Sequence, residues 1–362
     1  MRFLPVNFIL CQHSKVPKTP FRRGYGLLKG FSLIEILVAM SVLALMSVMI
    51  LSVISSVQRV TKQTASRTEQ FREARRAFER INQRLSEATL NTYLNYVDAS
   101  GQPRTTGTAT FVPYKYARIS ELRYLQTGTN AASVPLTAPH ANGTIIGQAV
   151  FFQAPIGQTG TNTLSSMNSL LNTVGYFLEK GSDSALRPPT VTSSPKIRYR
   201  LFELTEPTES LTIYSLTSGS SNYTGNAWFT TPLANTSYLH RLADNIVALL
   251  FEAEYLDTTG TATSSYPYNS APLSAGTSPT QPITENNLPS TVHVTMIAVD
   301  EASARRIQDL SIPLIDAQND DQTNPPPNNS LQALENQLQK NQLNYRKFDS
   351  VVFIGSAKWS AK

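Results

Sequence analysis

One uncharged segment near the N-terminus restricts the fold of this chain more than any other feature. The 23 residues from Ile36 to Gln58 carry no charge, and most are Val, Leu, Ile, Met, Ala or Ser. A helix crosses the hydrocarbon core of a bilayer with about 20 such residues. From Gly30 to Gly101 the chain has no other glycine and no proline, so nothing forces a helix to break. We therefore predict a long N-terminal helix whose first half, residues 31–57, spans a membrane.

A basic segment, residues 1–30, precedes this run. It contains no acid and six bases, which are Arg2, Lys15, Lys18, Arg22, Arg23 and Lys29. A secretory signal peptide places its apolar core before the cleavage site, whereas here the apolar run follows Gly30. Without residues 1–30 the chain has 31 − 6 = 25 bases against 25 acids. The basic character therefore belongs to this segment and does not indicate a nucleic-acid partner.

Gly30, Phe31, Glu35 and the run from Ile36 to Val57 together resemble the N-terminus of type IV prepilins and type II secretion pseudopilins. The resemblance implies that residues 1–30 are a prepilin leader. It also implies cleavage between Gly30 and Phe31 by a prepilin peptidase, followed by N-methylation of Phe31. Glu35 of one subunit would then attract the new amine of a neighbour during assembly. A second interpretation of Glu35 is a carboxylate that reaches the membrane surface by snorkelling.

Residues 58–96 are predicted to form an amphipathic second half of the same helix, running to about Tyr93. Apolar residues recur there at alternating spacings of three and four, the pattern of one helix face: Phe71, Ala74, Phe78, Ile81, Leu85 and Ala88. We expect Phe71, Phe78, Ile81 and Leu85 to pack against the rest of the chain. The arginines on the other faces are interpreted as a solvated surface.

Residues 97–362 are predicted to form a globular domain of α+β class, in which the long helix packs on an antiparallel sheet with long loops. Strands are expected at Ile145–Gln153, Val174–Glu179, Ile197–Leu204, Ile246–Leu256, Val292–Val299 and Val351–Ile354. Polar inserts near 257–287 and 317–329 are expected to be loops, and Leu331 to Leu343 a short helix. The order of Ile197–Leu204, Ala243–Leu256 and Leu288–Val299 is similar to the strand order of the J-type minor pseudopilin. The end from Asn344 to Ser360 is similar to that of Verru_Chthon cassette protein C.

No catalytic constellation is found in the sequence, so we predict no enzyme, no catalytic residue and no cofactor. The four histidines are far apart, and no zinc-protease, nucleophile-elbow or phosphate-loop motif is present. Asp316, Asp320 and Asp321 lie in a polar insert, but their spacing does not match an EF-hand, so no metal is predicted either.

The sequence is therefore interpreted as a minor, prepilin-like structural subunit of a type IV pilus or type II secretion pseudopilus. Its expected partners are a prepilin peptidase, other pilin or pseudopilin subunits, an inner-membrane assembly platform and the lipid bilayer. It would cross the inner membrane once, with the C-terminal domain outside the cytoplasm. The leader bases favour that orientation and the bases after the apolar run oppose it. The alternative is a signal-anchored envelope protein with a binding or enzymatic domain, which has no use for Gly30 or Glu35.

Overall fold

The computed structural model describes residues 30–99, 110–127, 136–164, 166–184, 187–188, 190–192, 194–215, 225–256, 262–265, 267–271, 284–315 and 328–357. The leader up to Lys29 lies outside these ranges. So do residues 316–327, which include Asp316, Asp320, Asp321 and most of the second insert. The chain divides into two compact units, one ending at Thr61 and the other beginning at Lys62. The division falls inside the first helix.

Helix α1 runs from Leu33 to Ser86, 54 residues without a break. The predicted continuation to about Tyr93 is wrong, because Tyr93–Val97 forms strand β1, paired antiparallel with β2 (Lys115–Ile119). After Ser86 the backbone forms hydrogen bonds to distant residues instead of helical ones, because Thr89 N donates to Gln153 O at 2.9 Å. The Thr and Asn residues of this stretch also favour such contacts over a continuing helix.

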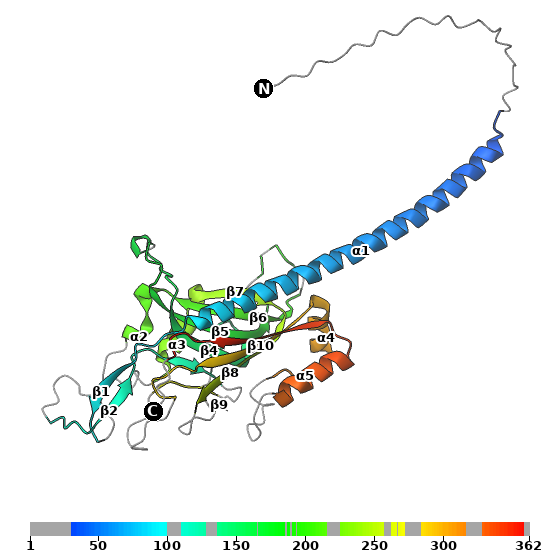
Figure 1. Ribbon diagram of the computed structural model, residues 1–362. Helices are drawn as coiled ribbons and strands as arrows, with labels where there is room; N and C mark the ends of the chain where they lie inside the picture. The colour runs from blue at the N-terminus through cyan, green and yellow to red at the C-terminus, as the bar shows by residue number, and fades with distance from the viewer. Residues whose placement is uncertain are drawn as a thin grey trace, which may run out of the picture. The chain divides into compact units, whose positions relative to one another are not determined.

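Five antiparallel strands form the larger sheet, in the order β3-β4-β5-β6-β7 (Figure 1). They are β3 (Tyr124–Gln126), β4 (Thr144–Pro155), β5 (Leu171–Ser182), β6 (Ile197–Glu206) and β7 (Leu239–Asp244). Alternate residues supply two separate apolar clusters, with Phe152 and Leu178 in one and Phe151 and Phe177 in the other. Both faces of this sheet are therefore buried. The second cluster includes Trp228 and Phe229 of helix α3 (Ala227–Leu233), which lies near the short α2 (Thr212–Ser215).

Four strands form the smaller sheet, in the order β11-β10-β8-β9. They are β8 (Ile246–Leu256), β9 (Ala262–Ser265), β10 (Thr291–Val299) and β11 (Tyr345–Phe353). Strand β9 lies inside the insert near 257–287 that was predicted to be a loop, so that prediction is wrong for these residues. The insert pairs with an edge of β8 that would otherwise leave backbone groups without partners.

The remaining helices are α4 (Glu301–Asp309) and α5 (Asn328–Lys340), with short 3₁₀ turns η1 (Asn162–Leu164), η2 (Thr208–Ser210) and η4 (Thr236–Tyr238). Helix α5 begins three residues before the predicted Leu331, so the insert expected to reach residue 329 ends earlier. The predicted α+β class, with one long N-terminal helix and antiparallel sheets, is confirmed.

A single residue, Asn245, connects the two sheets. It lies between β7 and β8 with φ of 60°, a left-handed conformation that asparagine adopts more readily than most residues. Its backbone N donates to Tyr199 O of β6 at 2.6 Å, and its carbonyl accepts from Val299 N of β10 at 2.9 Å. The turn at Asn245 thus joins the edge of one sheet to the centre of the other.

Candidate processing and assembly site

The predicted cleavage junction is open. The side chain of Phe31 is 82% exposed, and a Cβ placed on Gly30 would meet no atom within 4 Å. Gly30 also has an ordinary φ, because it is not among the glycines in the left-handed region. The fold therefore does not require glycine at this position. A requirement for glycine here would have to come from an enzyme that recognises the junction.

Glu35 takes part in a capping box at the start of α1. Ser32 Oγ accepts a hydrogen bond from Glu35 N at 3.3 Å, and Glu35 Oε2 accepts one from Ser32 N at 3.2 Å. This reciprocal arrangement satisfies two backbone donors that the helix itself cannot. The sequence contains its signal, a serine followed three residues later by glutamate, which the sequence interpretation did not use.

The apolar half of α1 is uncovered along its length. Every residue from Gly30 to Thr61 is exposed, and α1 contains an 18-residue window with mean hydropathy 2.7. Among the residues that the structure describes, it is the one helix long and apolar enough to cross a membrane. Ser41 Oγ donates to Val38 O and Ser47 Oγ to Leu43 O, both at 2.8 Å. These bonds within the helix lower the cost of placing hydroxyl groups in lipid.

The four predicted packing residues lie on one side of the second half of α1. Phe78 is 7% exposed, and Ile81 and Leu85 are fully buried in the larger apolar cluster. Phe71 is partly buried against the same cluster, with the Arg346 guanidinium 5.4 Å from its ring centre. The Phe78 ring lies 5.7 Å from that of Phe348 on β11. Phe71 and Phe78 therefore pack against β11 of the smaller sheet.

Arg80 lies at the surface, with its side chain 45% exposed, but its guanidinium also binds the domain, which the interpretation of the arginine run as a solvated surface did not include. It forms two hydrogen bonds to the fully buried Glu203 carboxylate, from Nε at 2.8 Å and Nη2 at 2.7 Å. Tyr176 Oη donates to the same carboxylate at 2.7 Å. Burial raises the pKa of Tyr176 well above its ordinary value and the Glu203 charge raises it further, so the phenol remains a donor. A buried carboxylate needs such partners, and they come from far along the chain.

Arg67 makes a second polar contact between α1 and the domain. Its Nε lies 2.8 Å from Asp300 Oδ2, and the Asp300 side chain is 1% exposed. The other carboxylate oxygen of Asp300 accepts from Ser303 N at 2.7 Å and caps helix α4. One turn further along α1, Gln70 Oε1 accepts from Glu301 N at 3.2 Å. Arg67 and Gln70 thus attach α1 to the start of α4, just before the stretch of α1 that is buried in the apolar cluster.

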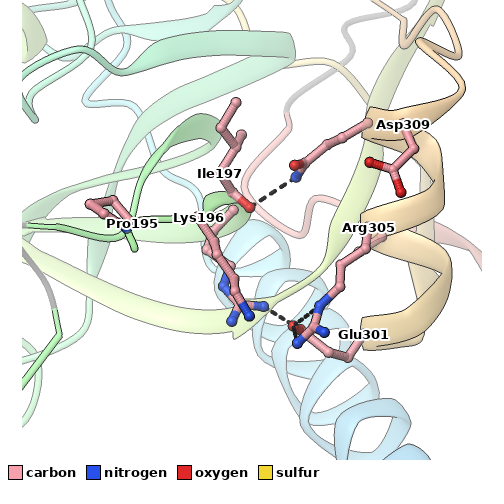
Figure 2. A pocket seen from close by; sticks show the side chains of 9 residues that line it. Pro195, Lys196, Ile197, Glu301, Arg305 and Asp309 are labelled. Atoms are coloured by element: carbon pink, nitrogen blue, oxygen red, sulfur yellow. Dashed lines mark hydrogen bonds and ion pairs between the residues drawn. The ribbon is translucent and has the colours of Figure 1, made fainter. Parts of the chain in front are cut away.

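A pocket of about 410 Å³ lies between the start of β6 and α4. Figure 2 shows Glu301 within reach of Arg305. Arg198 Nη1 also donates to the Glu301 carboxylate, and the Gln308 amide donates to Ile197 O at 2.9 Å. Although burial raises the pKa of Glu301, hydrogen bonds from Asn245 and Arg305 and the charge of Arg198 lower it below its ordinary value. Glu301 thus pairs with both Arg198 and Arg305, and these contacts join the start of β6 to α4. Among the described residues, no group of three or more His, Cys, Asp and Glu side chains could hold a metal ion.

Together these features define a single-pass, membrane-anchored protein with a capped, exposed N-terminal helix and an α+β domain. The sequence model described as the prokaryotic N-terminal methylation motif matches residues 29–51. This match supports the type IV prepilin and pseudopilin family, and with it processing by a prepilin peptidase and assembly with other pilins. No curated protein and no solved structure matches the chain. The resemblances to the J-type pseudopilin and to Verru_Chthon cassette protein C stay predictions.

Proposed function

We propose that this chain is a minor structural subunit of a type IV pilus or a type II secretion pseudopilus. The observation that supports this proposal is the order of three structural features at the N-terminus. An open Gly30–Phe31 junction is followed by a helix capped by Glu35 and by an apolar surface that the chain leaves exposed. A simple signal anchor needs the apolar helix but has no use for the Gly30–Phe31 junction or for Glu35.

Each segment of the chain is proposed to have its own role in processing and assembly. The leader, residues 1–30, is removed, and residues 31–57 anchor the subunit in the inner membrane. Residues 58–86 fix the anchor to the domain, which lies outside the cytoplasm. An inner-membrane platform then draws the helix into a filament, where the apolar surface exchanges lipid for the helices of neighbouring subunits.

Glu35 is proposed to have two successive roles. In the free subunit Glu35 Oε2 accepts from Ser32 N, while the carboxylate remains exposed. Cleavage after Gly30 creates an α-amine on Phe31, which becomes N-methylated and remains cationic. A neighbour's amine can then pair with the Glu35 carboxylate in apolar surroundings, where the Coulomb attraction is strong although desolvation offsets much of the gain.

Gly30→Ala is expected to leave the fold intact and to retain the leader. An added Cβ meets no atom within 4 Å, so any defect reports on recognition by the peptidase. Intact-mass spectrometry of the protein from its own cell should find the wild type starting at a methylated Phe31 and the variant still carrying residues 1–30. Gly26→Ala, a glycine inside the leader, is the matched control and should be cut normally. A wild-type protein that keeps its leader would contradict the proposed function.

Replacements of Glu35 separate the cap from the charge. Glu35→Gln keeps an oxygen that can cap the helix but removes the charge, because Gln also serves in a capping box. Glu35→Leu removes both. If the carboxylate binds a neighbour's amine, both variants should be cleaved and membrane-bound but enter filaments about tenfold less or worse, since a hydrogen bond to a charged group contributes about 1.5–3 kcal/mol. Normal incorporation of Glu35→Gln, measured by immunoblotting of sheared filaments, would show that only the cap matters.

A further inference from the structure

The stretch of α1 that follows the apolar run has an unbalanced charge. From Ile36 to Thr68 the chain contains no acid, and its only charged residues are Arg59, Lys62 and Arg67. The first acid beyond them is Glu69. Further along the helix the charges are paired, as in the contact of 2.8 Å between Arg75 and Glu79. The first two cations after the apolar run, Arg59 and Lys62, therefore have no acid within six residues in sequence.

Arg59 and Lys62 also have no polar partner in the part of the chain that the structure describes. Both are exposed, and no ion pair or hydrogen bond joins their side chains to any described residue. Arg67, the third cation, is different because Asp300 binds it. Arg59 and Lys62 are three residues apart on a helix, so their side chains project from neighbouring positions on the same side.

Helix geometry places these two cations at the level of lipid headgroups. The 22 residues from Ile36 to Val57 extend for about 33 Å at 1.5 Å per residue, which matches a hydrocarbon core of about 30 Å. Arg59 then lies about 3 Å beyond Val57, and Lys62 about 7.5 Å beyond it. The headgroup layer is roughly 5–7.5 Å thick on each side. Arg67, about 15 Å beyond Val57, lies outside that layer.

We infer that Arg59 and Lys62 bind the phosphate groups of anionic lipids at the surface where α1 leaves the membrane. This inference rests on the proposed membrane anchoring. Long basic side chains place their charged ends at headgroup level while their stems cover apolar surface. The pair explains why the subunit keeps two cations on a side of the membrane where the positive-inside rule disfavours them. Each basic side chain near an anionic surface strengthens binding about fivefold, so the pair prefers anionic lipid by up to about 25-fold.

The test uses the full-length chain in nanodiscs that contain equal amounts of phosphatidylglycerol and phosphatidylcholine. A Val57→Trp reporter at the end of the apolar run senses nearby lipid, and bromine atoms on the acyl chains of one lipid or the other quench its fluorescence. The chain without the reporter gives the background emission of Trp228 and Trp359, which is subtracted. The ratio of the two quenching efficiencies gives the local preference for the anionic lipid. Gly30, where the leader ends, is 57 − 30 = 27 residues before the reporter in sequence. A helix of that length extends for about 40 Å, several times the screening length, so the leader bases do not affect this ratio.

We expect brominated phosphatidylglycerol to quench more strongly than brominated phosphatidylcholine in the wild type. In Arg59→Gln/Lys62→Gln the ratio of the two quenching efficiencies should fall close to one. The charge-conserving exchange Arg59→Lys/Lys62→Arg should keep the preference for the anionic lipid. Arg72→Gln/Arg75→Gln, which removes two cations more than 20 Å beyond Val57, is the matched control and should also keep it. Raising the salt to 1 M should weaken the preference, because the screening length falls to about 3 Å.

Two outcomes would overturn the inference. One is equal quenching by both lipids in the wild type, and the other is an unchanged preference in Arg59→Gln/Lys62→Gln. Flotation with vesicles of pure phosphatidylcholine separates these results from a failure of the proposed function. A chain that does not float is not anchored in the membrane, and both proposals then fall. A chain that floats but shows no lipid preference contradicts only the inferred binding of anionic lipid and leaves the proposed membrane anchoring intact.

Discussion

Phe78→Ala is expected to destabilise the domain by about 3–5 kcal/mol, the usual cost of truncating a buried aromatic side chain. Phe78 is 7% exposed, and its ring packs against Phe348 at 5.7 Å. The truncation leaves a cavity between α1 and β11 that the neighbouring strand cannot fill without breaking its pairing with β10. The measurement is urea unfolding of a chain that begins at Lys62, where the second compact unit starts.

Phe353→Ala is the matched control for this experiment. It removes the same atoms from a phenylalanine of β11, the strand that contacts Phe78, but Phe353 is 72% exposed. Its effect should stay within about 1 kcal/mol, the range of strand propensities and surface substitutions. Equal unfolding midpoints for Phe78→Ala and the wild type would show that α1 does not stabilise the domain through this side of the helix.

Arg80→Met is expected to destabilise the domain by about 2–3 kcal/mol. The substitution keeps an unbranched side chain but leaves the carboxylate of Glu203 buried with Tyr176 as its remaining donor. Breaking a fully buried ion pair costs roughly 3–5 kcal/mol. The expected value is smaller here because the Arg80 side chain is 45% exposed, so solvent already screens part of the interaction.

Two further variants identify the cause of that effect. Arg75→Met removes an arginine of the same helix whose partner Glu79 is exposed, and it should cost no more than about 0.5 kcal/mol. Adding Glu203→Gln to Arg80→Met removes the buried charge and should restore part of the lost stability. A double-mutant cycle without coupling between Arg80 and Glu203 would contradict the contact as the source of the loss.

Repeating local patterns made much of the fold predictable from the sequence. The alternation of three- and four-residue spacings in α1 placed Phe78, Ile81 and Leu85 on one side of the helix. Strand β8 was predicted with its observed bounds, Ile246–Leu256, because nearly every residue in it is apolar. Strand β11 was only partly predicted. Its first half carries Arg346 and Lys347, which are exposed, so the charges concealed the strand pattern.

Contacts between distant residues account for most of what sequence reasoning missed. Arg80 and Glu203 are 123 positions apart, and no local pattern tells a paired arginine from a solvated one. The end of α1 was misplaced for the same reason, since Thr89 bonds to Gln153 on β4. The capping box of Ser32 and Glu35 is different. It is local, and the resemblance of Glu35 to an assembly residue directed attention away from its role in the helix itself.

The contact between α1 and β11 also determines the order in which the chain can fold. The larger sheet is a meander whose strands follow one another in sequence, so it can form while the chain is still being made. Phe71 and Phe78, however, contact Arg346 and Phe348 of β11. Helix α1 therefore obtains this cover from a strand that is synthesised long after it. A nascent or C-terminally truncated chain exposes the aromatic side of α1 beside the membrane, where chaperones and proteases can distinguish it from a finished subunit.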